Sequence, residues 1–305
     1  MGNRFYIVDV FAEEKYAGNQ LAVIRDAATL QTAEIQKIAR ETNYSETTFI
    51  LSDTPRDGGY DVRIFTPERE IPFAGHPTLG TAYIIHSEIE GCAATASAPV
   101  SGAGAGALTL NLKVGRIPVT FTRTPDGGEV LWMKQVPPVF GSRLDPRPVL
   151  ESIGLAESDL DERFPVQEVS TGLPFIITPL KSLRAVKKAR VDREKFAAVI
   201  EKTEAKDILL FCAETYHPEN RLNVRVFAEY EGVPEDPATG SANGCLAGYL
   251  VKHRYFGENR VDVRVEQGYE IGRPSLLLLK AEERGESIDV FVGGKVVMVA
   301  RGELV

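Results

Sequence analysis

The sequence repeats itself once, and this repetition restricts the fold to one built from two similar halves. Arg63-Ile64-Phe65 returns as Arg225-Val226-Phe227, 162 residues later, and Gly75-His76-Pro77 corresponds to Gly240-Ser241-Ala242 at an offset of 165. Because the two offsets differ by three, the second copy is expected to contain a three-residue insertion.

The insertion is expected shortly before the glycine of the second copy. Pro72 returns as Pro234 at the shorter offset, so the extra residues are expected between Pro234 and Gly240. They bring in Asp236, which then has no counterpart in the first copy. An aspartate ahead of a helix is often only a capping residue. This one lies five residues before Ser241, beside a candidate anion site, and we interpret it as functional.

Each copy has the same order of predicted elements. A helix with an apolar period of 3.6 residues is followed by two short strands and then by a helix of small residues. In the first copy these segments are Ala33–Glu41, Thr47–Leu51, Tyr60–Thr66 and His76–His86. In the second copy they are Arg193–Glu201, Ile208–Cys212, Arg221–Ala228 and Ser241–His253. Turn residues between the strands favour antiparallel pairing. The sequence predicts an α+β fold of two pseudo-symmetric halves, each with mostly antiparallel strands wrapped around a central helix.

A proline-rich stretch, residues 136–148, is expected to connect the two halves. The first half is predicted to cover residues 1–135 and about 295–305, because the last strand, Lys295–Gly302, is expected to return to it. The second half is predicted to cover residues 136–294. Two halves that face each other would form a cleft, which is a common location for a small-molecule site.

Composition limits the classes of partner. The formal net charge of −8 argues against general binding to nucleic acid or to an anionic membrane surface, but a few backbone amides can still hold a small anion. The uncharged stretch Gly91–Leu112 is mostly Ala, Gly, Ser and Thr, with Pro99 inside it, so it is too polar and too broken for a membrane helix. We interpret it as a small-residue loop that leads into the strand Ala107–Val114.

The cysteine and histidine residues give no pattern typical of a metal site. Three cysteines are too few and too scattered for a disulfide framework, and the odd count favours a reducing compartment, which predicts a cytoplasmic protein. The N-terminus begins as a strand and does not resemble a signal peptide. No Walker loop or dinucleotide fingerprint is present, so we expect neither a metal nor another cofactor.

The two central helices carry the first candidate site. Gly75-His76 and Gly240-Ser241 each place backbone N–H groups at a helix start, where the partial positive charge favours carboxylates or developing anions. If the halves are pseudo-symmetric, both starts would reach one cleft. The alternative is that the small residues only allow a buried helix to pack tightly, and the sequence alone does not decide between the two.

A second candidate is Glu46, which lies where a helix gives way to an apolar strand. A carboxylate at the buried end of a strand is costly unless it is paired or used. The alternative is an ordinary solvated loop residue. His76 is the one histidine beside a candidate site.

Several segments, in this order along the chain, resemble the PhzF-like phenazine-biosynthesis isomerase family. They are Val8–Phe11 with Ala17–Asn19, Asn43–Thr47, Pro72–Gly80, Ser170–Pro174, Glu235–Asn243 and Glu266–Gly268. The family has the diaminopimelate epimerase fold, in agreement with the duplication. Its members are commonly dimers, so the resemblance implies a homodimer.

The resemblance also implies roles for individual residues. Glu46 would be the catalytic acid or base, and the residues that bind the substrate would be Gly75, His76, Asp236, Gly240 and Ser241. Epimerases of this fold use one cysteine on each half, but the matching positions here are His76 and Ser241. A racemase that works with two thiols is therefore disfavoured.

These observations favour a cofactor-independent isomerase that moves a carbon-bound proton on a small substrate bearing a carboxylate. A single carboxylate can remove such a proton and return it elsewhere. Two alternatives remain at this point. One is an amino-acid epimerase or racemase with bases other than cysteine, and the other is a non-enzymatic module that binds a small ligand or a protein.

Overall fold

The chain folds into two compact units. The computed structural model describes residues 2–91, 106–125, 127–231 and 233–305. Unit 1 comprises Met1–Met133 with Gly293–Val305, and unit 2 comprises Lys134–Val292. The chain passes from one unit to the other within β8 (Glu129–Lys134) and again within β17 (Ser287–Gly294). The shared cleft stays a prediction, because each unit is described by itself.

Unit 1 has strands from both ends of the chain. Its helices are η1 (Ala27–Thr29), α1 (Thr32–Thr42), α2 (Gly75–Ile84) and the π-helix η2 (Ile85–Glu90). Its strands besides β8 are β1 (Arg4–Val10), β2 (Asn19–Ile24), β3 (Thr47–Ile50), β4 (Tyr60–Phe65), β5 (Glu70–Ile71), β6 (Gly106–Leu112), β7 (Gly115–Arg123) and β18 (Val296–Glu303).

Unit 2 has the same kind of element order. Its helices are α4 (Pro146–Ser152), η3 (Glu157–Asp159), α5 (Leu183–Lys188), α6 (Arg193–Ile200), η4 (Glu229–Glu231), α7 (Gly240–Lys252) and η5 (Tyr269–Ile271). Its strands besides β17 are β9 (Val139–Arg143), β10 (Gln167–Ser170), β11 (Pro174–Pro179), β12 (Asp207–Cys212), β13 (Leu222–Ala228), β14 (Val233–Asp236), β15 (Arg260–Gln267) and β16 (Ser275–Arg284).

Strand pairing is the same in both units. In unit 1, β1–β2, β3–β4 and β6–β7 are antiparallel, whereas β2–β3 and β4–β6 are parallel. In unit 2, β10–β11, β12–β13 and β15–β16 are antiparallel, whereas β11–β12 and β13–β15 are parallel. β18 pairs with β1 as β9 pairs with β10. The predicted α+β fold of two pseudo-symmetric halves is confirmed.

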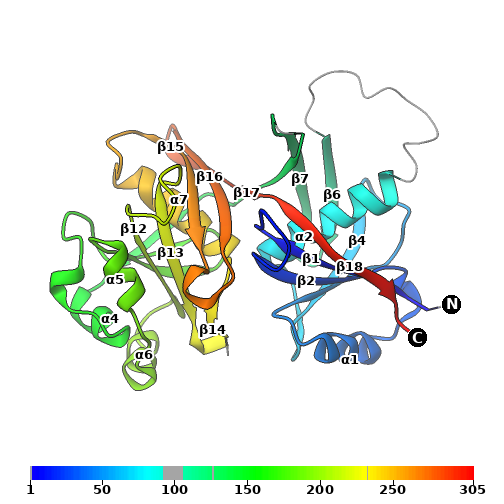
Figure 1. Cartoon of the computed structure of the whole chain (residues 1–305), viewed down its shortest axis with the longest axis horizontal. Coiled ribbons are helices and arrows are strands. Elements are labelled where there is room, and N and C mark those ends of the chain that lie inside the picture. The colour runs from blue at the N-terminus through cyan, green and yellow to red at the C-terminus, as the bar shows by residue number, and fades with distance from the viewer. Residues whose placement is uncertain (1, 92–105, 126, 232) are drawn as a thin grey trace. The chain divides into compact units, whose positions relative to one another are not determined.

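Each unit has a buried helix that packs on several strands (Figure 1). In unit 1, α2 contacts β1, β2, β3, β6, β7 and β18, and in unit 2, α7 contacts β10, β11, β15 and β16. Such close approach requires small residues. A Cβ atom at Gly80 in α2 would lie 2.5 Å from Leu21 Cδ2. Other helices pack elsewhere on the strands: α1 contacts β3 and β4, and α5 contacts β12 and β13.

An arginine–glutamate ion pair occupies the same place in each unit. Arg63 donates to both carboxylate oxygens of Glu70 at 2.9 Å, and Arg225 donates to those of Glu235 at 2.9 and 2.7 Å. The Arg63 guanidinium also lies over the Phe65 ring, at 4.9 Å, as that of Arg225 lies over Phe227, at 4.8 Å. The repeated tripeptide therefore carries a repeated set of contacts.

These contacts correct the predicted place of the insertion. Ile71 pairs with Ile64, and Asp236 pairs with Val226. Since Ile64 and Val226 are counterparts, Asp236 corresponds to Ile71, and the prediction that it has no counterpart is wrong. The next residues, Pro72 and Pro237, then correspond as well.

The three extra residues therefore precede Glu235, between β13 and the end of β14, where η4 (Glu229–Glu231) lies. The match of Pro72 to Pro234 was misleading because proline is common in such turns. The register of the ladder, together with the ion pair, identifies the true counterpart of Pro72 as Pro237.

Two other segments differ from the expectation or fall outside the structure. The stretch 136–148 contains β9 and the start of α4, and β9 pairs with β10, so it is a structured part of unit 2 and not a connection. The small-residue loop was predicted within Gly91–Leu112, and its residues 92–105 lie outside the described residues. β6 begins at Gly106, one residue before the predicted strand Ala107–Val114. Within the described ranges, no helix is both long and apolar enough to span a bilayer.

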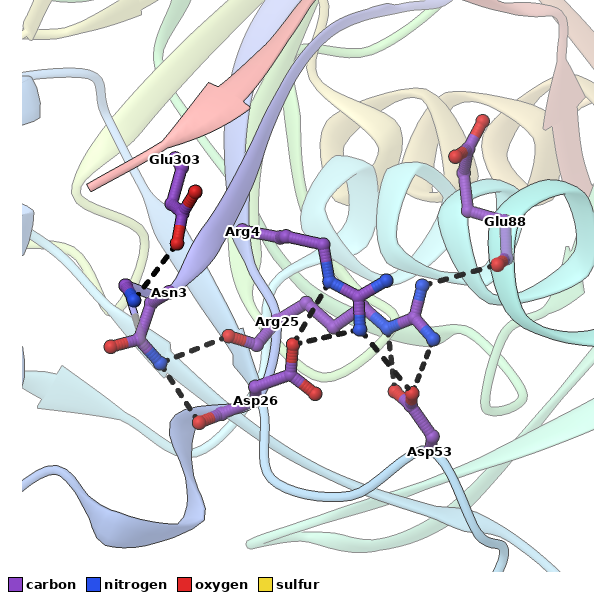
Figure 2. Close-up of polar contacts among 8 residues, drawn as sticks. Asn3, Arg4, Arg25, Asp26, Asp53, Glu88 and Glu303 are labelled. Atoms are coloured by element: carbon purple, nitrogen blue, oxygen red, sulfur yellow. Dashed lines mark hydrogen bonds and ion pairs between the residues drawn. The ribbon is translucent and has the colours of Figure 1, made fainter. Parts of the chain in front are cut away.

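The helix predicted to end at His86 continues as the π-helix η2. Arg25 holds this extension: its side chain is paired through two nitrogens with Asp53, and Nη1 donates to the Glu88 carbonyl oxygen at 3.1 Å. Figure 2 shows Arg25 between these two groups, with Arg4 linking Asp26 to Asp53. π-Helical turns are uncommon, and here a buried guanidinium binds a carbonyl group of the turn.

The duplicated ion pairs provide a matched test of burial. Glu235→Gln should lower the free energy of unfolding by about 3–5 kcal/mol, because it leaves Arg225, whose side chain is only 5% exposed, without its charged partner. Glu70→Gln should cost at most about 1 kcal/mol, because both side chains of that pair are 24% exposed. Urea unfolding measures the loss in free energy of unfolding for each variant, and hydrogen exchange of the β13 and β4 amides shows where each loss is felt. Equal losses would contradict this assignment.

Candidate active site

Glu46 lies in the short connection between α1 and β3 in unit 1. The helix ends because Asn43 adopts a left-handed conformation, with φ 53°, which asparagine tolerates better than most residues. The Thr42 and Thr47 hydroxyls are 2.7 Å apart and close the connection around Glu46. The Glu46 side chain is 17% exposed, so it is not the solvated loop residue of the alternative interpretation.

His76 lies in the first turn of α2, and its side chain is 7% exposed. Nε2 lies 3.5 Å from Oε2 of Glu46. Unit 1 therefore brings together the two side chains that the sequence proposed separately, one from a loop before a strand and one from a helix start.

Burial keeps the His76 ring neutral. It lowers the pKa of His76 from 6.5 to about 3, and a hydrogen bond to the Gln20 backbone opposes this effect only in part. A bond that favours the protonated ring is one in which a ring N–H donates to a carbonyl oxygen. Nε2 makes no hydrogen bond among the described residues, so the donor is Nδ1. The lone pair of Nε2 is then on the side of Glu46.

The start of α2 has no acidic residue in its first turn, and the N-cap residue, Ala74, has no side chain that could accept a hydrogen bond. The Thr78 hydroxyl donates to the Ala74 carbonyl oxygen at 2.7 Å and so does not compete for the amides. Helix geometry leaves the N–H groups of Gly75 and His76 without partners inside the helix. They can donate to an anion at this end.

The start of α7 in unit 2 is built differently. Thr239 is the N-cap residue, but its side chain does not cap the helix. Its hydroxyl instead donates to Oδ2 of Asp236 at 2.6 Å. Asp236 thus lies beside the helix start that carries Gly240 and Ser241, as the sequence predicted, and its carboxylate accepts a hydrogen bond from the cap residue itself.

Gln267 also lies at this helix start, although no pattern in the sequence predicts a role for it. Its side-chain amide is buried and bonds to Thr239, Asn243 and the Asp236 backbone. The segment Glu266–Gly268 is distinctive in the sequence only through its family resemblance. A correct alignment of the two copies would have indicated a role for Gln267. It places this polar residue, at the end of β15, opposite an apolar residue at the end of the equivalent strand in unit 1.

The described cysteines cannot supply a reactive thiolate. Cys245 lies in α7 about one turn after Ser241 and is fully buried, and burial raises its pKa to about 12. Burial likewise raises the pKa of Cys212 to about 12. Cys92 lies outside the described residues. In the part of the chain that the structure describes, no three histidine, cysteine, aspartate or glutamate side chains gather as ligands for a metal ion.

The predicted site residues therefore form two groups. Glu46, Gly75 and His76 lie together in unit 1, whereas Asp236, Gly240 and Ser241 lie together in unit 2. Each group surrounds the start of the buried helix of its unit. That both groups serve one substrate stays a prediction.

A match to a known family covers almost all of this sequence. Residues 8–302 match the phenazine biosynthesis-like proteins, PhzC-PhzF. The chain belongs to this family. A trans-2,3-dihydro-3-hydroxyanthranilate isomerase of Pseudomonas fluorescens is 34% identical, with 99% of both chains covered. An uncharacterized isomerase of Mesorhizobium japonicum is 32% identical over 100% of this chain and 99% of the relative.

Solved structures agree with this assignment. The PhzF-family protein of Bacillus anthracis has a TM-score of 0.88 and 27% identity, over 100% of this chain and 99% of that one. A probable proline racemase of Agrobacterium radiobacter shares the fold, with a TM-score of 0.58 at 9% identity, over 99% of this chain and 93% of that one. The resemblance drawn from the motifs is confirmed, and this member of the phenazine biosynthesis-like family is an isomerase.

The neutral state of His76 can be tested directly. At pH 5 an ordinary histidine is mostly protonated, but His76 should remain neutral, with the proton on Nδ1, because its pKa is lowered to about 3. Long-range ¹H–¹⁵N correlation spectra between pH 7 and pH 4.5 resolve the two ring nitrogens. His86, which is more exposed, is the internal comparison. A His76 ring that titrates near pH 6.5 would refute the assignment.

Proposed function

We propose that this protein catalyses, without a cofactor, the transfer of a proton between two carbon atoms of a small substrate that bears a carboxylate. The observation that carries the proposal is the contact of 3.5 Å between Glu46 and a neutral, buried His76 at a helix start. It combines a group that can exchange a proton with donors that can hold an anion.

Glu46 is the acid or base in this proposal. As a carboxylate it takes a proton from a substrate carbon, and the electron pair of that C–H bond shifts into the substrate. The protonated Glu46 then returns the proton to a second carbon, which completes an isomerisation without net change in atoms. His76 serves as a neutral partner: its Nε2 lone pair can accept a hydrogen bond from the protonated Glu46.

The helix starts hold the substrate. The Gly75 and His76 amides, and the Gly240 and Ser241 amides, are donors of the kind that bind carboxylates and stabilise developing negative charge. The Asp236 carboxylate accepts a hydrogen bond from the Thr239 hydroxyl, and it can also accept one from a cationic or hydroxyl group of a ligand. An acceptor beside a set of donors suits a substrate that has an amino or hydroxyl group near its carboxylate.

This chemistry agrees with the names of the relatives. The Pseudomonas fluorescens relative is a trans-2,3-dihydro-3-hydroxyanthranilate isomerase, whose substrate name denotes a cyclic acid with amino and hydroxyl groups. We extend to this chain only the class, a small cyclic or amino-acid-like carboxylic acid. That compound is the first to assay.

An epimerase that works with thiols is the less favoured activity. Cys245 is fully buried with a pKa of about 12, and the positions at the two helix starts are His76 and Ser241. A homodimer and a cytoplasmic location complete the proposal. The homodimer rests on the family resemblance, and the cytoplasmic location rests on the odd number of cysteines. Light scattering on the purified protein tests whether it is a dimer.

Replacing Glu46 tests the proposal. Glu46→Gln should keep the fold and ligand binding, because the amide has nearly the same shape, but turnover should fall about 10²- to 10⁴-fold, as for a lost acid/base group. NMR observation of deuterium entering a carbon-bound position of candidate acids in D₂O measures the step. Wild-type exchange by Glu46→Gln would sink the proposal.

Two further variants separate catalysis from binding. Asp236→Asn and His76→Ala should weaken binding or orientation and keep part of the activity, because these residues support the reaction without carrying the proton. Thermal unfolding of each variant, compared with Glu46→Gln, shows whether lost activity reflects lost fold. If Glu46→Gln lost stability and the remaining folded molecules kept their activity, Glu46 would be structural.

A further inference from the structure

The last two residues of β15 point to opposite sides of the strand, as successive strand residues do. Glu266 is fully buried and accepts from the backbone amides of Tyr216 and His217 and from the side chains of Asn220 and Asn223. These contacts hold the loop after β12. Gln267 is also fully buried but serves the other side, the start of α7.

The side-chain amide of Gln267 makes four hydrogen bonds. Oε1 accepts from the Thr239 amide at 3.2 Å and from Asn243 Nδ2 at 2.8 Å. Nε2 donates to the Asp236 carbonyl oxygen at 2.8 Å and to the Thr239 hydroxyl at 3.0 Å. The hydroxyl donates in turn to Oδ2 of Asp236 at 2.6 Å. Because each link has one possible direction, the chain of bonds runs from Gln267 through Thr239 to Asp236.

Gln267 also holds the N-cap residue of α7, Thr239. A threonine at an N-cap position usually accepts an amide hydrogen with its hydroxyl, but the Thr239 hydroxyl is used for Asp236. Oε1 of Gln267 accepts from the amide of Thr239 itself, which is not an amide that a capping hydroxyl would take. The following amides, those of Gly240 and Ser241, keep their direction along the helix axis and remain donors for a ligand.

Unit 1 shows that the fold itself does not need this network. Tyr60 pairs with Leu110 as Leu222 pairs with Val265, so the last residue of β6 corresponds to Gln267. The counterparts of Gln267, Thr239 and Asp236 in unit 1 are Leu112, Ala74 and Ile71. All three positions are apolar there, and the strands and the buried helix form in the same order. The polar set therefore serves something other than the packing of the helix.

The backbone next to Gln267 is shaped for the same close approach. Gly268 has φ 78°, and a Cβ atom at this position would lie 2.6 Å from the Pro237 carbonyl oxygen. Only glycine allows this contact, which keeps the end of β15 against the segment that carries Asp236.

We propose that Gln267 is a positioning residue for the reaction: it sets the Asp236 carboxylate through the Thr239 hydroxyl and holds the α7 start in the geometry that presents its amides. The proposal rests on the proposed function for the role of Asp236 and Ser241 in substrate binding. The bonds themselves are independent of that function, so the two can fail separately.

The test uses the residue that unit 1 has at this position. Gln267→Leu removes the four bonds and keeps an apolar side chain of similar size. With the substrate of the Pseudomonas fluorescens relative, KM should rise about 10- to 100-fold, since the Thr239 hydroxyl is no longer held against the Asp236 carboxylate, while kcat changes less than threefold. Gln167→Leu is the matched control, because Gln167 is also a buried strand glutamine. It bonds to Gly141 of β9 and to His253, which lies at the other end of α7.

Thr239→Val tests the direction of the chain of bonds. It removes the hydroxyl and should raise KM by a similar factor, and the double variant with Gln267→Leu should raise it no further, because both remove one linkage. Additive effects would overturn the linkage.

Hydrogen exchange at the α7 start provides a readout that needs no substrate. The Thr239 and Gly240 amides should exchange at least tenfold faster in Gln267→Leu, and not in Gln167→Leu. Anthranilate, an aromatic acid without a proton to shift, tests binding by calorimetry. If the wild type neither binds anthranilate nor exchanges a carbon-bound proton of any candidate acid in D₂O, the proposed function fails, and amide hydrogen exchange alone decides the place of Gln267. Unchanged exchange, or a KM shift shared by Gln167→Leu, overturns the inference.

Discussion

Each unit depends on a helix that is buried among strands. Small side chains let the strands approach such a helix closely, which explains the glycines and alanines of α2 and α7 and the close contact at Gly80. Neither helix start has a side-chain cap, so the first amides of each helix point to whatever polar group lies beyond that end. The candidate site residues of each unit gather at that start, and the strands of the unit hold the helix in place.

The two units keep the same frame and differ at those starts. The arginine–glutamate ion pair and the pattern of parallel and antiparallel strands are common to both. At the helix start, unit 1 has a buried histidine next to a carboxylate, whereas unit 2 has an aspartate held by a threonine and a glutamine. Duplication followed by divergence at a few positions gives proton exchange to one copy and ligand orientation to the other in the proposed function.

Much of this arrangement could be predicted from the sequence, because periodicity and repetition are local signals. The helix at 33–41, the paired strands and both buried helices were found this way. The place of the insertion was not, because one proline matched by chance and only the ladder register distinguishes Pro234 from Pro237. The neutral state of His76 depends on burial and on a backbone group of β2, and the role of Gln267 depends on atoms 28 residues away. Neither leaves a local pattern.

The return of β18 to β1 has a consequence for how the chain is made. Unit 2 is contiguous, so all its strands are available once β17 has left the ribosome, whereas β1 lacks one neighbour until β18 emerges. During that interval the apolar β1, with Val8 and Val10 fully buried in the finished protein, is an unprotected edge strand. The half of the chain that is synthesised first is thus the half that is completed last, and until β18 arrives its β1 edge is open to pairing with another chain.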